Sequence, residues 1–190
     1  MGWFEAMTIS LAIDTATSRT IVGVVNNGIT VFEEFHEGAT DHGKAISELV
    51  AKALKATVIP DQVVIGMGPG PFTGLRVGIT FAQSFALARS IPWIGVCSLD
   101  AIRIDSTTND LGTDEYTVAI DARRKQMYWA SYKAGVRIKG PSVDKPEDIE
   151  QFITNVFPDV TKLVKLGSTQ NVREPFYLRS PDAIPTAERR

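Results

Sequence analysis

Short apolar runs and longer amphipathic runs alternate along the first 104 residues. In TISLAID (8–14), apolar residues alternate with small ones, as expected for a buried strand. Residues 41–56 instead place apolar side chains at helical spacing behind Asp41, the expected N-cap. The same criteria predict strands at 8–14, 20–25, 29–35, 62–67 and 91–96, and helices at 41–56, 75–89 and 98–104. The resulting order, βββαβαβα, predicts an α/β fold for a first lobe, residues 1–104.

The pattern begins again beyond a polar stretch, residues 105–115, which is typical of a linker. VAID (118–121) repeats LAID (11–14), and each copy leads through a polar turn into a second strand. Further strands are predicted at 126–132, 135–140 and 162–168, with a helix at 146–157 that starts at Pro146. The repeated βββαβ order, with a strand-terminal Asp in each copy, indicates a duplication. We therefore expect a second lobe, residues 116–190, that faces the first across a cleft.

Composition and charge are those of a globular protein in water. Of 190 residues, 44% are hydrophobic and 22% are charged, and the formal net charge is −2. The acidic balance argues against electrostatic binding of nucleic acid by the chain alone. The basic run Arg123, Arg124 and Lys125 is accordingly interpreted as a solvated turn.

The start of the chain and its single cysteine bear on the cellular compartment. MGWFEAM has no basic region ahead of an apolar one, and no apolar run approaches the roughly 20 residues that cross a bilayer. Cys97 has no partner for an internal disulfide, which suits a reducing compartment. We expect a cytoplasmic protein without membrane contact, in which Met7 is the true start and residues 1–6 are an extension.

A glycine-rich loop, GMGPGPFTGLRVG (66–78), joins a predicted strand to a predicted helix. It matches neither a Walker A loop nor the dinucleotide fingerprint, because the glycine spacing differs and Leu75 stands where a lysine is needed. One interpretation is a tight turn whose glycines allow close packing. The other is anion contact by the backbone amides of Phe72, Thr73 and Gly74 at the start of the helix. The sequence leaves both open. Separately, Asp14 and Thr15 in the first hairpin are candidates for contact with a metal-bound phosphate.

The helix after the loop carries two apolar stripes. Gly78, Ala82 and Ala86 form a narrow stripe of small residues, and Val77, Phe81 and Phe85 form a second stripe beside it. One stripe suffices to cover the helix's own sheet. The other is available to a neighbour, either the Ile46–Leu49–Ala53 helix of the same lobe, which the sequence favours, or a partner protein.

A search for catalytic groups finds none. His36 and His42 do not stand at a zinc-binding spacing, and Cys97 ends an apolar strand as a buried thiol would. Asp14 is followed by hydroxyl residues, but its counterpart Asp121 is followed by Ala122 and two arginines. We therefore predict no catalytic residues and no metal site.

Several segments together resemble the TsaB (YeaZ) family of bacteria. They are LAIDTATSRT, GPGPFTGLRVGITFAQSFALA, IPWIGVCSLDAI, VAIDARRKQMYWASY and FYLRSPDA, of which GPGPFTGLRVG is the most specific. The resemblance implies the duplicated actin-like (ASKHA, RNase H-like) fold and a non-catalytic role in making threonylcarbamoyladenosine beside the anticodon of tRNAs that read A-starting codons. The catalytic paralogue, TsaD, has a histidine pair where this chain has Ser98 and Ile102.

The resemblance also implies partners. They are TsaD and TsaE homologues, a second copy of the chain when it is alone, and tRNA only within the complex. ATP or ADP is expected, if anywhere, at the interface with the partner. The first-lobe helices would form that interface through Ile46, Leu49, Val50, Ala53, Val77, Gly78, Phe81, Ala82, Phe85 and Ala86. A charge at Ala82 is accordingly expected to break the complex without unfolding the chain.

One departure from the family and two alternative functions remain. After residue 168 the chain runs almost directly to PFYLRSP, so the second lobe is expected to be shorter than in the family. The first alternative is a small-molecule kinase or ATP-binding protein of the same superfamily, which would bind ATP through Asp14. The second is a protease that acts on a partner, against which the missing metal ligands argue.

Overall fold

The computed structural model describes residues 8–104 and 114–179. The expected extension at residues 1–6 and all but the last two residues of the expected linker lie outside these ranges. No helix within them has the length and apolar character needed to span a bilayer.

A five-stranded mixed sheet forms the centre of the first lobe, in the order β3-β2-β1-β4-β5. β1 pairs antiparallel with β2, β2 pairs antiparallel with β3, and β4 and β5 run parallel to β1. The strands are β1 (Ile9–Asp14), β2 (Arg19–Asn26), β3 (Ile29–Glu37), β4 (Gln62–Gly66) and β5 (Trp93–Val96). All five strands predicted for this lobe are therefore confirmed, with β5 two residues shorter at its start.

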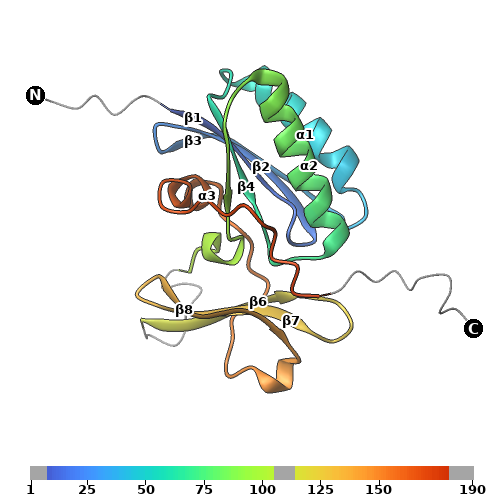
Figure 1. Ribbon diagram of the computed structural model, residues 1–190, viewed down its shortest axis with the longest axis vertical. Coiled ribbons are helices and arrows are strands. Elements are labelled where there is room, and N and C mark those ends of the chain that lie inside the picture. The colour runs from blue at the N-terminus through green and yellow to red at the C-terminus, as the bar shows by residue number, and fades with distance from the viewer. Residues whose placement is uncertain (1–7, 105–113, 180–190) are drawn as a thin grey trace, which may run out of the picture.

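Helices cover both faces of this sheet (Figure 1). Helices α1 (His42–Ala56) and α2 (Phe72–Arg89) pack on one face, where Leu11 and Ile13 of β1 point. The residue between them, Ala12, points to the other face and packs with α3 (Val160–Leu166). Because both faces are buried, the central strands are apolar nearly throughout.

A three-stranded antiparallel sheet, β6-β7-β8, forms the second lobe (Figure 1). Its strands are β6 (Glu115–Asp121), β7 (Met127–Lys133) and β8 (Val136–Asp144). It repeats the β1-β2-β3 meander, and a single parallel bridge from Val118 to Ile153 occupies the place of the β1–β4 pairing. Asp121 Oδ1 accepts a hydrogen bond from the Arg123 N–H (2.9 Å), as Asp14 Oδ1 accepts one from Ala16 (2.8 Å).

Three predictions of helix and strand were wrong. The helix expected at 146–157 is a short 3-10 turn, Pro146–Asp148, and the one expected at 98–104 is a 3-10 turn, Leu99–Ala101. The strand expected at 162–168 is the helix α3, whose N-cap Asp159 accepts a hydrogen bond from the Lys162 N–H at 2.7 Å. At seven residues, periodicity alone does not separate a buried helix from a buried strand. Asp41 does stand at the N-cap of α1, but its side chain makes no capping hydrogen bond.

Candidate functional site

The glycine-rich loop lies directly against the turn between β1 and β2. A Cβ atom on Gly70 would come within 2.5 Å of the Ala16 carbonyl oxygen, and one on Gly78 within 2.2 Å of Thr15 Oγ1. Thr15 Oγ1 itself donates a hydrogen bond of 2.8 Å to the carbonyl oxygen of Gly74. Glycine is needed here because a methyl group would collide with the turn. The packing interpretation of the loop is therefore confirmed.

Asp14, at the end of β1, is fully buried beneath this loop. Its Oδ1 accepts a hydrogen bond from the Ala16 N–H. Its buried Oδ2 makes no hydrogen bond of full geometry with the residues that the structure describes, although the Ser98 hydroxyl lies close enough to the carboxyl to affect its pKa. Burial raises the pKa of this carboxyl from its usual 3.8 to about 6, and the Ser98 hydroxyl and Ala16 N–H lower it in part. Thr15 is fully buried as well, so contact of either side chain with a nucleotide stays a prediction.

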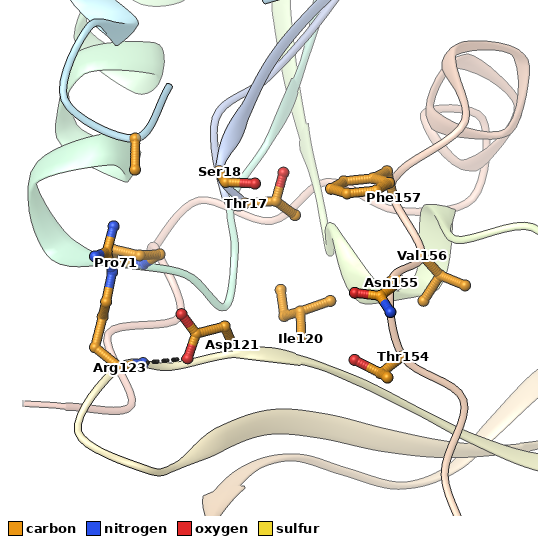
Figure 2. A pocket seen from close by; sticks show the side chains of 11 residues that line it. Thr17, Ser18, Pro71, Ile120, Asp121, Arg123, Thr154, Asn155, Val156 and Phe157 are labelled. Atoms are coloured by element: carbon orange, nitrogen blue, oxygen red, sulfur yellow. Dashed lines mark hydrogen bonds between the residues drawn. The ribbon is translucent and has the colours of Figure 1, made fainter. Parts of the chain in front are cut away.

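A pocket of about 150 Å³ lies between the two lobes (Figure 2). Thr17 and Ser18 line it from the β1–β2 turn, and Asp121 lines it from the end of β6. The remaining lining residues are Ala39, Pro71, Ile120, Arg123, Thr154, Asn155, Val156 and Phe157. The pocket can offer hydroxyls and one carboxylate to a ligand. Its volume is below the roughly 300–1,000 Å³ typical of small-molecule sites.

Thr73 and Gly74, the other predicted anion contacts, differ in exposure. Gly74 is buried, whereas Thr73 is exposed and lines a second pocket of about 100 Å³. Arg123 and Arg179 line the same pocket. No sequence pattern predicted that these two arginines lie together. The basic run at 123–125 is visible in the sequence, but nothing there places it beside the start of α2.

Most of the predicted interface residues are buried inside the chain. Seven of the ten pack in the core between the helices and the first sheet: Ile46, Leu49, Val50, Ala53, Gly78, Ala82 and Ala86. The stripe of small residues on α2 thus faces the chain's own sheet and the Thr15 turn. Val77, Phe81 and Phe85 are half-buried and remain partly available to a partner.

The exposed side of the α1–α2 pair, which we call the outer face, has a seam of larger apolar side chains between two rows of small ones. Phe81 and Phe85 stack with ring centroids 6.2 Å apart, and Val77 continues the seam. The small exposed residues beside the seam are Gly43, Ser47 and Ala51 on α1 and Thr80, Ser84 and Ala88 on α2. Small residues beside an apolar seam allow another helix to approach closely.

A buried polar network centred on Asp100 joins the two lobes. Asp100 accepts hydrogen bonds from Tyr132 Oη of β7 (2.9 Å) and from Gln170 Nε2 (2.7 Å), and it lies 3.4 Å from Arg137 Nη1 of β8. Arg137 Nη1 also lies 3.1 Å from Cys97 Sγ. Burial raises the pKa of the Cys97 thiol to about 12, which suits a structural thiol.

Tyr132→Phe is expected to lower the free energy of unfolding by about 1–2 kcal/mol, because it leaves a buried carboxylate oxygen with one donor fewer. Urea unfolding followed by circular dichroism measures this change. Tyr116→Phe is the matched control, since that half-buried ring stacks on Tyr132 at 5.3 Å. Equal effects of the two substitutions would contradict the role given to the Tyr132 hydroxyl.

Ser98 and Ile102, the two positions at which the family resemblance implied a lost histidine pair, have structural contacts. Ser98 Oγ accepts a hydrogen bond from the Gly68 N–H at 3.0 Å, and Ile102 is buried in the core of the second lobe. His42 is buried with Nδ1 2.8 Å from Thr20 Oγ1, and burial lowers its pKa. Within residues 8–104 and 114–179, no three His, Cys, Asp or Glu side chains gather as they would around a metal ion.

Comparison with known proteins gives consistent matches. A family model described as "TsaD: tRNA N6-adenosine threonylcarbamoyltransferase" matches residues 33–183. An uncharacterized Mycobacterium leprae protein is 43% identical over 152 residues, 76% of this chain and 41% of that protein. Escherichia coli TsaB, a tRNA threonylcarbamoyladenosine biosynthesis protein, is 38% identical over 127 residues, 65% of this chain and 54% of that protein. The chain thus spans about half the length, or less, of these two relatives.

A solved structure of an uncharacterized Pseudomonas aeruginosa protein, described as similar to peptidase YeaZ, matches with a TM-score of 0.76. The match is 22% identical and covers 91% of this chain and 100% of that one. The chain is therefore an α/β protein with the mixed-sheet fold of that structure. The family model and the named relatives, in turn, place the chain in the TsaB (YeaZ) family, as the sequence motifs predicted.

Proposed function

We propose that this chain is a non-catalytic partner subunit in the formation of threonylcarbamoyladenosine on tRNA, and that it binds a TsaD homologue through the outer face. The observation that carries the proposal is the seam of Val77, Phe81 and Phe85 at the surface of the α1–α2 pair. The name of E. coli TsaB supports the pathway. A second copy of the chain would cover the same face when no partner is present.

The outer face has the chemistry of a helix-packing interface. Its centre is aromatic and aliphatic, which is the composition that favours tight, dry contact. Charged residues lie toward its rim, where Lys44 and Glu48 face each other across one turn of α1. Burial of the apolar seam would contribute about 25 cal/mol for each Å² removed from water.

The test replaces a small exposed residue beside the seam. Ser84→Arg puts a bulky charge on the outer face without touching the core, because Ser84 is exposed. We expect its heterodimer with a TsaD homologue, measured by size exclusion with light scattering, to weaken by more than about 100-fold. The reason is that the complex would have to bury an unpaired guanidinium.

Ser168→Arg is the matched control, since Ser168 lies just beyond α3, on the opposite face of the sheet. It should bind as the wild type does. A Ser84→Arg heterodimer of wild-type affinity would reject the outer face as the interface. Loss of the complex in both variants would show that the effect does not depend on which face carries the arginine, and it too would reject the outer face as the interface.

The finer features of the fold belong to the same proposal. The two meanders support a duplicated actin-like fold with a shortened second lobe. In each meander the Asp that ends the first strand accepts a hydrogen bond from the backbone N–H of the residue two positions later. TsaE as a further partner, tRNA bound only in the complex, and ATP or ADP at the partner interface remain predictions of the family resemblance.

The interlobe pocket favours one alternative, a small-molecule kinase or ATP-binding protein. Thr17, Ser18 and Asp121 could contact a phosphate or its metal ion there. Asp14 is unsuitable as the test residue because it is buried in the core. Calorimetric titration with Mg-ATP should show no binding to the isolated chain; micromolar binding that Asp121→Asn abolishes would favour the kinase.

A further inference from the structure

Basic and aromatic side chains from three separate segments meet around Phe72, at the start of α2. The Tyr177 ring lies 4.8 Å from the Phe72 ring, centroid to centroid, and the Arg76 guanidinium lies 4.7 Å from it. Arg123, from the β6–β7 turn, and Arg179 line the same small pocket as Phe72. We call this group of five residues the arginine–tyrosine patch.

The β6–β7 turn presents its basic residues in an unusual backbone conformation. Arg123, Arg124 and Lys125 all have positive φ angles, of 64°, 53° and 59°. Asp121 Oδ1 accepts the Arg123 N–H, and the Arg123 carbonyl accepts the Gln126 N–H at 3.0 Å, so the turn is held at both ends. All three basic residues are exposed. In Figure 2 the Arg123 side chain runs from this turn toward Pro71.

The last segment of the chain is tied to the same turn. Arg179 Nη1 donates a hydrogen bond to the carbonyl oxygen of Ala122. Tyr177, two residues earlier, keeps 41% of its surface exposed while it packs on Phe72. An arginine and an exposed aromatic ring are thereby held beside the basic turn.

This combination is the chemistry with which proteins bind single-stranded RNA. Guanidinium groups pair with phosphate oxygens in a fixed fork geometry, and exposed aromatic rings stack on unpaired bases. An acidic protein surface would form ion pairs with the arginines but would gain little binding energy from the exposed Tyr177 ring. The neighbouring carboxylate, Asp121, has Oδ1 engaged by the Arg123 N–H.

We infer that the arginine–tyrosine patch binds the single-stranded loop of an RNA hairpin, with phosphates on Arg76 and Arg123 and a base on Tyr177. That this RNA is the anticodon loop of a tRNA rests on the proposed function. Arg76 precedes Thr80 of the outer face by one turn of α2, so a partner on the outer face would lie beside the patch. The chain would then bind RNA by itself despite its net charge of −2, in contrast to the expectation that tRNA binds only within the complex.

The experiment measures binding of a fluorescein-labelled RNA hairpin with a loop of about seven nucleotides to the full chain, by anisotropy at several salt concentrations. We expect a Kd of about 10–100 μM at low salt. Arg76→Gln combined with Arg123→Gln should weaken binding at least about 10-fold and lower the slope of log K against log salt by about 1.4, for two phosphates on a single strand.

Tyr177 tests the stacking contact separately. Tyr177→Leu should weaken binding by about 5- to 10-fold with an unchanged salt slope, and Tyr177→Phe should restore it. The matched control combines Lys55→Gln with Arg89→Gln, which removes two exposed charges at the far ends of α1 and α2. That control should change Kd by less than about 2-fold.

Three results would overturn the inference. The first is that the wild type does not bind the hairpin, and the second is that the control variant weakens RNA binding as much as the arginine variant does. The third is that the arginine variant loses the complex with the TsaD homologue while its RNA binding is unchanged. The last would assign the patch to an acidic protein. The proposed function fails separately, through a Ser84→Arg chain that still forms the heterodimer.

Discussion

Ala82→Glu is expected to destabilise the chain by more than about 4 kcal/mol, a large part of the roughly 5–15 kcal/mol that stabilises a native protein. Ala82 has no exposed surface and lies in the core between the two helices and the first sheet. A glutamate there would bury an unpaired carboxylate or push α2 off the sheet. Thermal melting followed by circular dichroism at about pH 7.5 measures the loss.

Ala88→Glu is the control, because it makes the same substitution at an exposed position further along α2. We expect it to change stability by less than about 0.5 kcal/mol. The sequence-based expectation that a charge at Ala82 breaks a complex without unfolding the chain is wrong, since the stripe of small residues faces inward. An Ala82→Glu chain that melts like the wild type would contradict this burial.

Asp14→Asn is expected to stabilise the chain at pH 7.5 by about 2–3 kcal/mol. The pKa of Asp14 is raised from 3.8 to about 6, so at pH 7.5 the wild type carries a fully buried carboxylate, one oxygen of which makes no hydrogen bond of full geometry with the described residues. A tenfold change in an acid dissociation constant corresponds to about 1.4 kcal/mol between the two protonation states. Asparagine keeps the acceptor for the Ala16 N–H and removes the charge.

The sign of the pH dependence follows from the raised pKa. The folded state binds the Asp14 proton more tightly than the unfolded state, so this group's stabilisation is complete below about pH 4 and is lost as pH rises through about 6. The difference between Asp14→Asn and wild type should therefore grow from near zero at about pH 4 to its full value at about pH 7.5. Urea titrations at each pH measure it, and a less stable variant at the higher pH would contradict the assignment.

The five strands and two long helices of the first lobe could be predicted because local patterns determine them. β1 and β2 are apolar with turn residues between them, and the spacing of Ile46, Leu49 and Ala53 is that of a helix. The error at 162–168 arose because α3 is short and covers a sheet made by residues far away in the chain. The side of α3 that is buried depends on where the first sheet lies, and the local sequence of α3 does not contain that information.

The candidate surfaces were only partly predictable for the same reason. Sequence spacing identified two stripes on α2 but could not say which one faces inward. Gly78 settles this in the structure, because Thr15 leaves no room for a side chain there. Tyr177 and Arg179 lie in FYLRSPDA, a segment that the family resemblance includes, but no sequence pattern places them beside Phe72 and the Ala122 carbonyl.

The sequence by itself determined the family, the order of the five strands and two long helices in the first lobe and the repeated meander, because these follow from motifs and short-range periodicity. Only the tertiary structure decided which side of α2 is exposed, that α3 closes the far face of the first sheet, and that three arginines meet beside Tyr177. Those features depend on contacts between segments far apart in the chain, such as Thr15 with Gly74 and Arg179 with Ala122. Such contacts form only when the whole chain has folded.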